Sequence, residues 1–161
     1  LYYMSLMNST NPYWITGAQA LSAPKLKKID IEPIPTSLLV VEPGESVGWV
    51  GDAKPIPKHK PDIAAAYATA GEMLGHRITI LERGSGAPGP ARPEMFKAVS
   101  KATDNLVICA GSSKNTQDIE QTVKAGADGI HIASMIEKAD DPFKKAKEVI
   151  SKTKEVGEQT K

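Results

Sequence analysis

The segment Ile-Leu-Glu-Arg-Gly-Ser-Gly, residues 80–86, decides how the rest of the chain is interpreted. It starts inside an apolar run, Arg77–Leu81, that predicts a buried strand, and it continues into a carboxylate, Glu82, and a glycine-rich turn. Ligands of parallel sheets bind at the carboxyl ends of the strands. Gly84 and Gly86 would allow backbone N–H groups to approach an anion there. A structural turn beside a solvated glutamate is the alternative interpretation.

Composition restricts the class of protein. The chain has 161 residues, with 20 Lys and Arg against 19 Asp and Glu, and 5% of its residues are aromatic. This length is enough for one domain with its own core, which we predict over residues 1–161. The net charge of +1 and the few aromatic side chains give no reason to expect a nucleic acid partner. One cysteine, Cys109, excludes an internal disulfide and fits a reducing compartment, so we expect a cytoplasmic protein.

Five apolar runs alternate with helical patterns along the chain. This order predicts an α/β fold in which right-handed crossovers join the strands of a parallel sheet. A long irregular connection is expected over Gly44–Lys60. The predicted strands are Leu1–Met7, Ser37–Val41, Arg77–Leu81, Leu106–Ala110 and Asp128–Ala133.

Helical spacing predicts which faces of two helices are buried. The helix that starts at Pro61 should bury Ile63, Tyr67, Ala70 and Leu74. The helix that starts at Pro142 should bury Phe143, Ala146, Val149 and Ile150.

Three successive strands are predicted to end in small residues. Their ends read Gly84-Ser85-Gly86, then Ala110-Gly111-Ser112-Ser113, then Ala133-Ser134. Each precedes a helix, so backbone N–H groups of the three turns could form one shared anion pocket. We therefore predict a phosphate site, beside which Glu82 holds a substrate hydroxyl. The alternative is that the small residues only permit tight turns.

Four stretches carry a resemblance to a known family: Asn8–Gln19 (Asn-Ser-Thr-Asn-Pro-Tyr-Trp-Ile-Thr-Gly-Ala-Gln), Val41–Gly44 (Val-Glu-Pro-Gly), Gly48–Pro57 (Gly-Trp-Val-Gly-Asp-Ala-Lys-Pro-Ile-Pro) and Leu81–Pro88 (Leu-Glu-Arg-Gly-Ser-Gly-Ala-Pro). Together they resemble geranylgeranylglyceryl phosphate synthase, an archaeal prenyltransferase with bacterial relatives that use shorter prenyl chains. The resemblance covers nearly the whole chain. It implies the fourth to eighth strands of a (β/α)₈ TIM barrel, with the N-terminal strands missing.

The resemblance also implies the reaction. A hydroxyl of sn-glycerol 1-phosphate attacks the first carbon of geranylgeranyl diphosphate, an ether forms, and diphosphate leaves with the help of Mg²⁺. Glu82 is implied to bind the glycerol hydroxyl and to assist its deprotonation. A homo-oligomer and a contact with the membrane surface are expected, and Tyr13 and Trp14 could line a prenyl groove. The implied substrate-binding residues are Ile80, Leu81, Glu82, Arg83, Gly84, Ser85, Gly86, Ala110, Gly111, Ala133 and Ser134.

Several positions depart from the family pattern. The family usually has Tyr at position 80, Ala at 83 and Gly at 133, where this chain has Ile80, Arg83 and Ala133. It also usually has three glycines and then Ile-Arg where this chain has Cys-Ala-Gly-Ser-Ser-Lys, residues 109–114. Each lost glycine restricts the approach of the backbone to a phosphate. Arg83 and Lys114 could offset this loss with direct charge.

The resemblance assigns no metal ligand to this chain, because the family's Mg²⁺-binding residues lie on the first strands of the barrel. The chain by itself is therefore expected to be inactive. Cys109 is interpreted as a small core residue and His131 as a packing residue in the middle of a strand. Two other interpretations stay open: a non-catalytic module that binds phosphate, and another barrel enzyme that acts on phosphorylated sugars.

Overall fold

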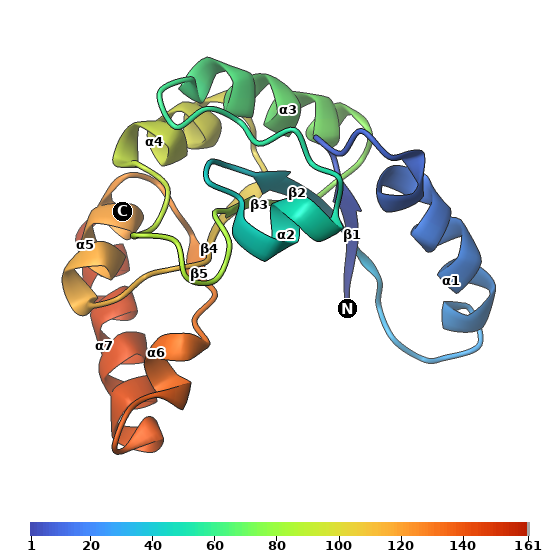
Figure 1. The fold of residues 1–161 in the computed structure, drawn as a ribbon. Helices are drawn as coiled ribbons and strands as arrows, with labels where there is room; N and C mark the ends of the chain where they lie inside the picture. The colour runs from blue at the N-terminus through green and yellow to red at the C-terminus, as the bar shows by residue number, and fades with distance from the viewer. Residues whose placement is uncertain (161) are drawn as a thin grey trace.

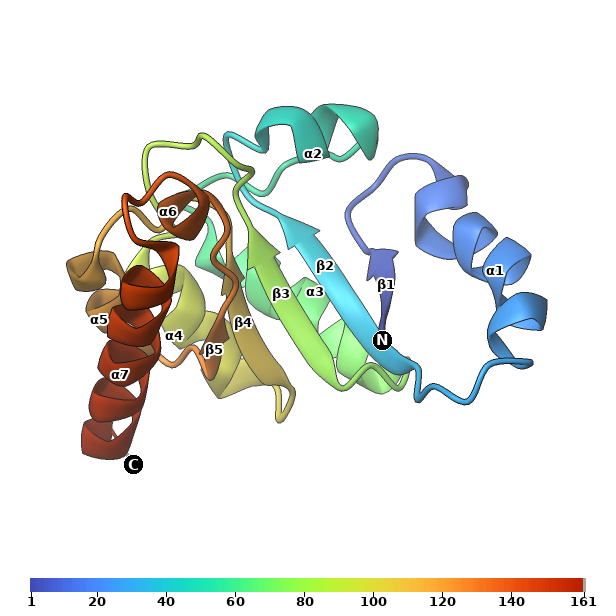
Figure 2. The same ribbon diagram turned by 90° about the horizontal axis from the view of Figure 1, so that it is seen from below.

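Five parallel strands lie side by side in chain order (Figure 2), in a computed structural model that describes residues 1–160. The predicted alternation of strands and helical connections is confirmed. The last strand is shorter than the predicted Asp128–Ala133, because only its first residues pair with the neighbouring strand at Ile108 and Cys109. The strands are β1 (Tyr2–Leu6), β2 (Ile34–Val40), β3 (Ile78–Glu82), β4 (Leu106–Ala110) and β5 (Gly129–Ile130).

Helices cover the outer side of the curved sheet, and its concave side faces the hollow of the arch in Figure 1. The connection over Gly44–Lys60 is not wholly irregular as predicted, since it holds the short helix α2. The helical elements are a π-helix, η1 (Tyr13–Gly17), and α1 (Ala18–Leu26), α2 (Glu45–Val50), α3 (Pro61–Met73), α4 (Pro93–Ala102), α5 (Thr116–Lys124), α6 (Ser134–Glu137) and α7 (Pro142–Thr160).

The core lies on both faces of the sheet, because successive side chains of a strand point to opposite sides. On β3, Leu81 belongs to the large cluster beneath α3 and α4, together with Phe96 and Val99 of α4. Its neighbour Ile80 belongs to a smaller cluster with Ile108. Apolar side chains of the central strands are therefore buried on both faces of the sheet, beneath helices on the outer face and against other strand residues on the concave face.

The buried face of α3 differs from the predicted one. Ala64, Ala68 and Gly71 are buried, whereas Leu74 is 70% exposed. The cause is close packing, since a Cβ on Gly71 would collide with the side-chain oxygen of Ser37 on β2. Only small side chains fit at these positions between α3 and the sheet. Of the other predicted residues, Tyr67 is half-buried and packs against the core, whereas Ile63 and Ala70 are exposed.

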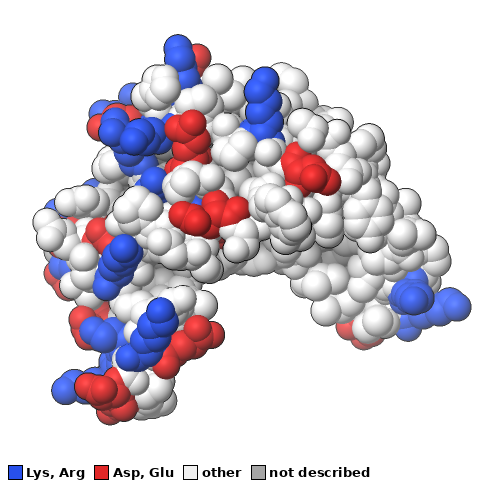
Figure 3. Space-filling view, viewed as in Figure 1, with Lys and Arg blue, Asp and Glu red and all other residues white. Residues whose placement is uncertain are grey.

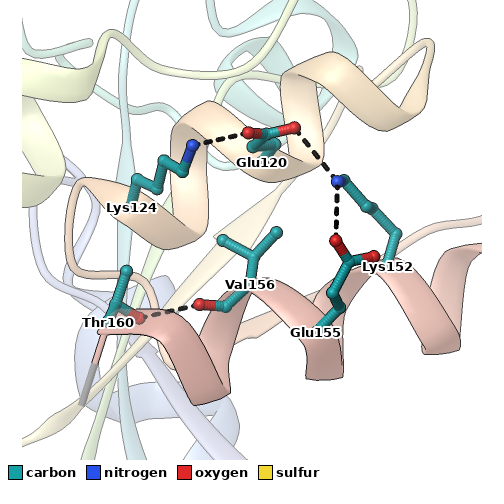
Figure 4. Close-up of polar contacts among 6 residues, drawn as sticks. All are labelled: Glu120, Lys124, Lys152, Glu155, Val156 and Thr160. Carbon is teal, nitrogen blue, oxygen red and sulfur yellow. Dashed lines mark hydrogen bonds and ion pairs between the residues drawn. The ribbon is translucent and has the colours of Figure 1, made fainter.

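Helix α7 packs against α5 and buries Val149 and Val156. The predicted inward positions of Phe143 and Ile150 are wrong, since these side chains are 83% and 55% exposed. The two helices are also joined by a charged cluster in which Lys152 lies 3.2 Å from Glu120 (Figure 4). Asp141 caps α7, because its side chain accepts a hydrogen bond from the backbone N–H of Lys144 at 2.9 Å.

Positive and negative side chains are interspersed over the face of the molecule shown in Figure 3, without a large patch of one sign. Among residues 1–160, no helix has both the length and the apolar character that crossing a bilayer requires.

Candidate functional site

The strand ends that carry the predicted site lie at one level of the sheet. Glu82, the last residue of β3, pairs with Val40 of β2 on one side and with Ala110 of β4 on the other. The turns that follow these strands therefore leave the sheet next to one another. Had these turns pointed to different sides of the molecule, the prediction of a shared pocket would have failed.

A cavity of about 600 Å³ opens between the turns after β3, β4 and β5. It combines one carboxylate with hydroxyl groups, small residues and two lysines, so it is polar and suited to an anion that also carries hydroxyl groups. The lining residues are Glu82, Ser85, Gly86, Ala87, Ala110, Gly111, Ser112, Ser113, Lys114, His131, Ile132, Ala133, Ser134, Met135 and Lys138.

Glu82 is half-buried, and one of its carboxylate oxygens accepts a hydrogen bond from the backbone N–H of Gly84 at 2.5 Å. Burial raises the pKa of Glu82 above its ordinary value, and the backbone hydrogen bonds from Gly84 and Arg83 oppose this shift. A carboxylate with a raised pKa is a better proton acceptor than an exposed one. Glu82 therefore has the character of a general base at the floor of a polar cavity.

Two glycines are required where the turns interlock. Gly84 has a φ of +91°, and a Cβ there would lie 2.8 Å from the carbonyl oxygen of Gly44. Gly111 has a φ of +77°, and a Cβ there would collide with the carboxylate of Glu82. Ser112 joins the two turns, because its hydroxyl donates to the carbonyl of Gly84 at 2.7 Å. The position of Glu82 thus depends on the absence of a side chain at its neighbours.

The lysines of the cavity carry charge that no protein group neutralises. Within residues 1–160, neither Lys114 nor Lys138 forms an ion pair. The side-chain oxygen of Ser113 is buried without a hydrogen-bond partner in the same part of the chain. An anionic ligand would supply acceptors for all three groups.

Sequence reasoning missed two polar residues of the cavity, His131 and Lys138, together with Ala87, Ile132 and Met135. His131 was expected to pack in mid-strand, but β5 ends before it and its ring stacks on Tyr2, with the ring centroids 5.4 Å apart. Lys138 ends the short helix α6, four residues after Ser134. This helical spacing from Ser134 was the only sequence signal that could have placed Lys138 beside the cavity.

Four of the predicted substrate-binding residues do not line the cavity. Ile80 and Leu81 are core residues, 2% and 0% exposed. Gly84 is buried beneath Ser85 and Gly86, which do line it. The guanidinium of Arg83 is engaged by backbone carbonyls, at 2.6–2.9 Å.

Cys109 is fully buried in the core beneath the site, as predicted. Burial raises the pKa of its thiol to about 12. The thiolate form is therefore negligible at neutral pH, and Cys109 is not a nucleophile of the site.

A second cavity, of about 490 Å³, lies between β1, β2, α1 and α2. Its lining is almost entirely apolar and includes Leu6, Trp14 and Leu38. Tyr13 is not part of this lining, although its ring contacts that of Trp14 edge-on, with the centroids 4.9 Å apart. Trp14 thus lines an apolar cavity and Tyr13 does not, and a prenyl groove here stays a prediction.

No group of three or more His, Cys, Asp or Glu side chains that could hold a metal ion occurs within the part of the chain that the structure describes. The residues present therefore do not form the Mg²⁺ site that the resemblance implies for the whole enzyme.

The sequence profile of the PcrB family matches residues 1–154. Among curated relatives, geranylgeranylglyceryl phosphate synthase of Methanosphaera stadtmanae is 53% identical over 149 residues, which are 92% of this chain and 61% of that protein. The same enzyme of Thermococcus kodakarensis is 55% identical over 139 residues, or 86% of this chain and 55% of that protein. The chain thus spans about 60% of the length of the curated relatives it matches.

Solved structures agree with the sequence comparison. (S)-3-O-geranylgeranylglyceryl phosphate synthase of Thermoplasma acidophilum, crystallised in complex with its substrate sn-glycerol-1-phosphate, superposes with a TM-score of 0.92 at 31% identity. The match covers 96% of this chain and 62% of that chain. The enzyme of Thermoplasma volcanium gives a TM-score of 0.91 at the same identity and coverage.

Proposed function

The chain belongs to the PcrB family, and we propose that it forms the glycerol 1-phosphate site of a prenyltransferase that joins this substrate to geranylgeranyl diphosphate. The observation that carries the proposal is the convergence of three strand-end turns on one cavity, in which a single carboxylate, Glu82, accompanies two unpaired lysines. A relative with 31% identity is known with sn-glycerol-1-phosphate bound.

In the proposed complex the phosphate group lies against the turns at Gly111 and Ser134, within reach of the ammonium groups of Lys114 and Lys138. The glycerol hydroxyl that reacts then points toward Glu82. This carboxylate accepts the hydroxyl proton while the hydroxyl oxygen forms a bond to the first carbon of the prenyl diphosphate. The bond from that carbon to the diphosphate oxygen breaks, and diphosphate leaves with the electron pair. The raised pKa of Glu82 favours this proton transfer.

The apolar cavity beside Trp14 suits the prenyl chain of the second substrate. A polyprenyl chain offers only hydrocarbon surface, and burial of that surface contributes about 25 cal/mol per Å². The side chains of Leu6, Leu38 and Val47 provide a matching lining.

The remaining expectations belong to the same proposal. The five strands would form part of a (β/α)₈ barrel in a single domain, because β1 leaves Leu1, Tyr2 and Met4 38–49% exposed at an unpaired edge. Trp49 on α2, 84% exposed, could contact a membrane surface or a second copy of the chain. Mg²⁺ belongs to the proposed reaction of the whole enzyme, and residues 1–160 contain no group of three or more His, Cys, Asp or Glu side chains that could hold it.

The test combines a binding measurement with a turnover measurement. Calorimetry measures the affinity of the chain for sn-glycerol 1-phosphate, with its enantiomer as the control. A radiolabel assay with geranylgeranyl diphosphate and Mg²⁺ then measures formation of the ether by the full-length gene product, unchanged and with Glu82→Gln. Glutamine can still accept the hydrogen bond from Gly84, so the variant is expected to fold, to bind the phosphate and to lose turnover.

The same experiment separates the alternatives. Selective binding without ether formation by the full-length gene product would favour the non-catalytic phosphate-binding module, which the departures from the family's glycines within residues 109–114 and at Ala133 also favour. No binding of glycerol 1-phosphate would reject both readings of the cavity.

A further inference from the structure

Arg83 binds three backbone carbonyls from two separate segments. Its Nε donates to the carbonyl of Glu42 at 2.7 Å, in the turn after β2. Its Nη1 donates to the carbonyls of Gly89 and Pro90 at 2.6 and 2.9 Å, in the loop after β3. The side chain is half-buried and does not line the polar cavity. It therefore joins the two loops on the side away from the substrate site.

The loop after β3 needs a donor from outside itself. Pro88, Pro90 and Pro93 have no backbone N–H, so this segment is rich in acceptors and poor in donors. The planar guanidinium of Arg83 presents several N–H groups in a fixed arrangement and can serve carbonyls in both loops at once. A lysine in its place has one nitrogen and lacks this geometry.

The other end of the same loop forms the wall of the cavity. Ser85 and Gly86 line it, and the carbonyl of Gly84 just before them accepts the hydroxyl of Ser112. Arg83 holds the far end of the loop at Gly89 and Pro90. Between these two attachments, the backbone N–H of Ala87 donates a hydrogen bond to the carbonyl of Gly84 at 3.3 Å.

We propose that Arg83 is a positioning residue that holds the loop 84–90 in the conformation that binds the phosphate substrate, through the geometry of its donors and not through its charge. This inference rests on the proposed function for its ligand, sn-glycerol 1-phosphate. It replaces the expectation that Arg83 meets the phosphate directly.

Two substitutions separate geometry from charge. Arg83→Lys keeps the positive charge and removes the fork of donors, whereas Arg83→Ala removes both. If geometry decides, both variants lose affinity by a similar factor, about tenfold. This factor corresponds to about 1.4 kcal/mol of binding free energy. The loss is then independent of ionic strength, because the partners of the guanidinium are neutral carbonyls. If charge decides, Arg83→Lys binds like the parent protein and the loss in Arg83→Ala diminishes with added salt.

The experiment measures the dissociation constant of sn-glycerol 1-phosphate at low and high salt, together with amide hydrogen exchange of residues 84–89. Arg92→Lys and Arg92→Ala are the matched controls, because Arg92 flanks the same loop, is exposed and makes no side-chain hydrogen bond that the structure records. The expected result is faster exchange in the loop and weaker binding in both Arg83 variants, and neither change in the controls.

Three outcomes would overturn the inference: parent-like binding by Arg83→Lys, loop exchange that is unchanged in both Arg83 variants, or a lower melting temperature with unchanged affinity, which indicates a purely structural role. Failure of the parent protein to bind glycerol 1-phosphate would instead reject the proposed function. The exchange rates of the loop would then still decide whether Arg83 holds it.

Discussion

The hydroxyl of Tyr2 lies 3.4 Å from Nε2 of His131, although 129 residues separate the two in the sequence. Tyr2 belongs to β1 and His131 follows β5, so the contact joins the two outer strands of the five-stranded sheet. A flat sheet would hold these strands far apart, since neighbouring strands are about 4.8 Å apart. The contact therefore reports the curvature of the sheet, which also brings His131 into the wall of the polar cavity.

This contact predicts a change in the titration of His131. Burial lowers the pKa of His131, and the ring of Tyr2 covers one of its faces. Tyr2→Ala should expose the imidazole and move its pKa back toward its ordinary value, while Tyr2→Phe should leave it nearly unchanged because the stacked ring remains. Proton NMR titration of the imidazole checks this, and an equal pKa in all three proteins would show that Tyr2 does not shield His131.

The cavity lysines should contribute to anion binding through their charge. Lys114→Gln and Lys138→Gln are each expected to weaken binding of sn-glycerol 1-phosphate by about threefold to tenfold at low salt, and by less at high salt. Lys144→Gln on α7 is the control, because Lys144 is exposed and does not line the cavity. Calorimetry at two ionic strengths measures the effect. A loss as large in the control would mean that overall charge, not the cavity, attracts the anion.

Gly111 should be intolerant of a side chain. Gly111→Ala forces a residue into the left-handed region and places its Cβ against the carboxylate of Glu82, so we expect a loss of about 1–3 kcal/mol in the free energy of unfolding. Gly89→Ala is the matched control in a neighbouring loop, since a Cβ there meets nothing within 4 Å and its φ is not positive. Urea denaturation compares the two variants, and equal stabilities would contradict the packing described for Gly111.

Cys109 should resist thiol reagents while the protein is folded. Its side chain is fully buried and its pKa is raised to about 12. Reaction with Ellman's reagent at neutral pH should therefore proceed only at the rate at which the protein opens, and it should become rapid in denaturant. Fast labelling of the native protein would place Cys109 at an accessible position, contrary to the structure.

The pair formed by Ser37 and His76 should make stability depend on pH. Nδ1 of His76 lies 2.6 Å from the Ser37 hydroxyl, and burial lowers the pKa of His76 from 6.5. The unfolded chain then takes up the proton first, so stability is fully present above about pH 6.5 and is lost as the pH falls toward the lower folded pKa. As the pH falls from about 7.5 to about 5.5, His76→Gln should lose less stability than the parent protein. Urea denaturation at each pH measures the free energy of unfolding.

The difference between the parent protein and His76→Gln isolates this group. Burial also lowers the pKa of His131, and it raises that of Glu82, whose effect has the opposite sign and extends upward from the acid range. Both effects are common to the two proteins and cancel in the comparison. An equal loss of stability on acidification would show that His76 does not titrate within this range.

Much of the site could be predicted from the sequence, because each strand end is an apolar run followed directly by small residues. Leu106–Ala110 was predicted with its observed bounds, and its end, together with that of β3, carries the small residues that line the cavity. The face of α3 could not be predicted in this way. Ile63 and Leu74 follow the helical period, but Ala64, Ala68 and Gly71 are buried because the gap between α3 and β2 accepts only small side chains.

The amino-acid sequence by itself determined the order of strands and helices and the position of the turns that line the polar cavity, because apolar runs, prolines and glycines act on their immediate neighbours. Only the tertiary structure decided the direction of Arg83 and the inclusion of His131 and Lys138 in the cavity. A side chain at a strand end turns toward whichever acceptors lack a donor, and those acceptors belong to loops that are distant in sequence. The curvature of the sheet decides which of these loops meet.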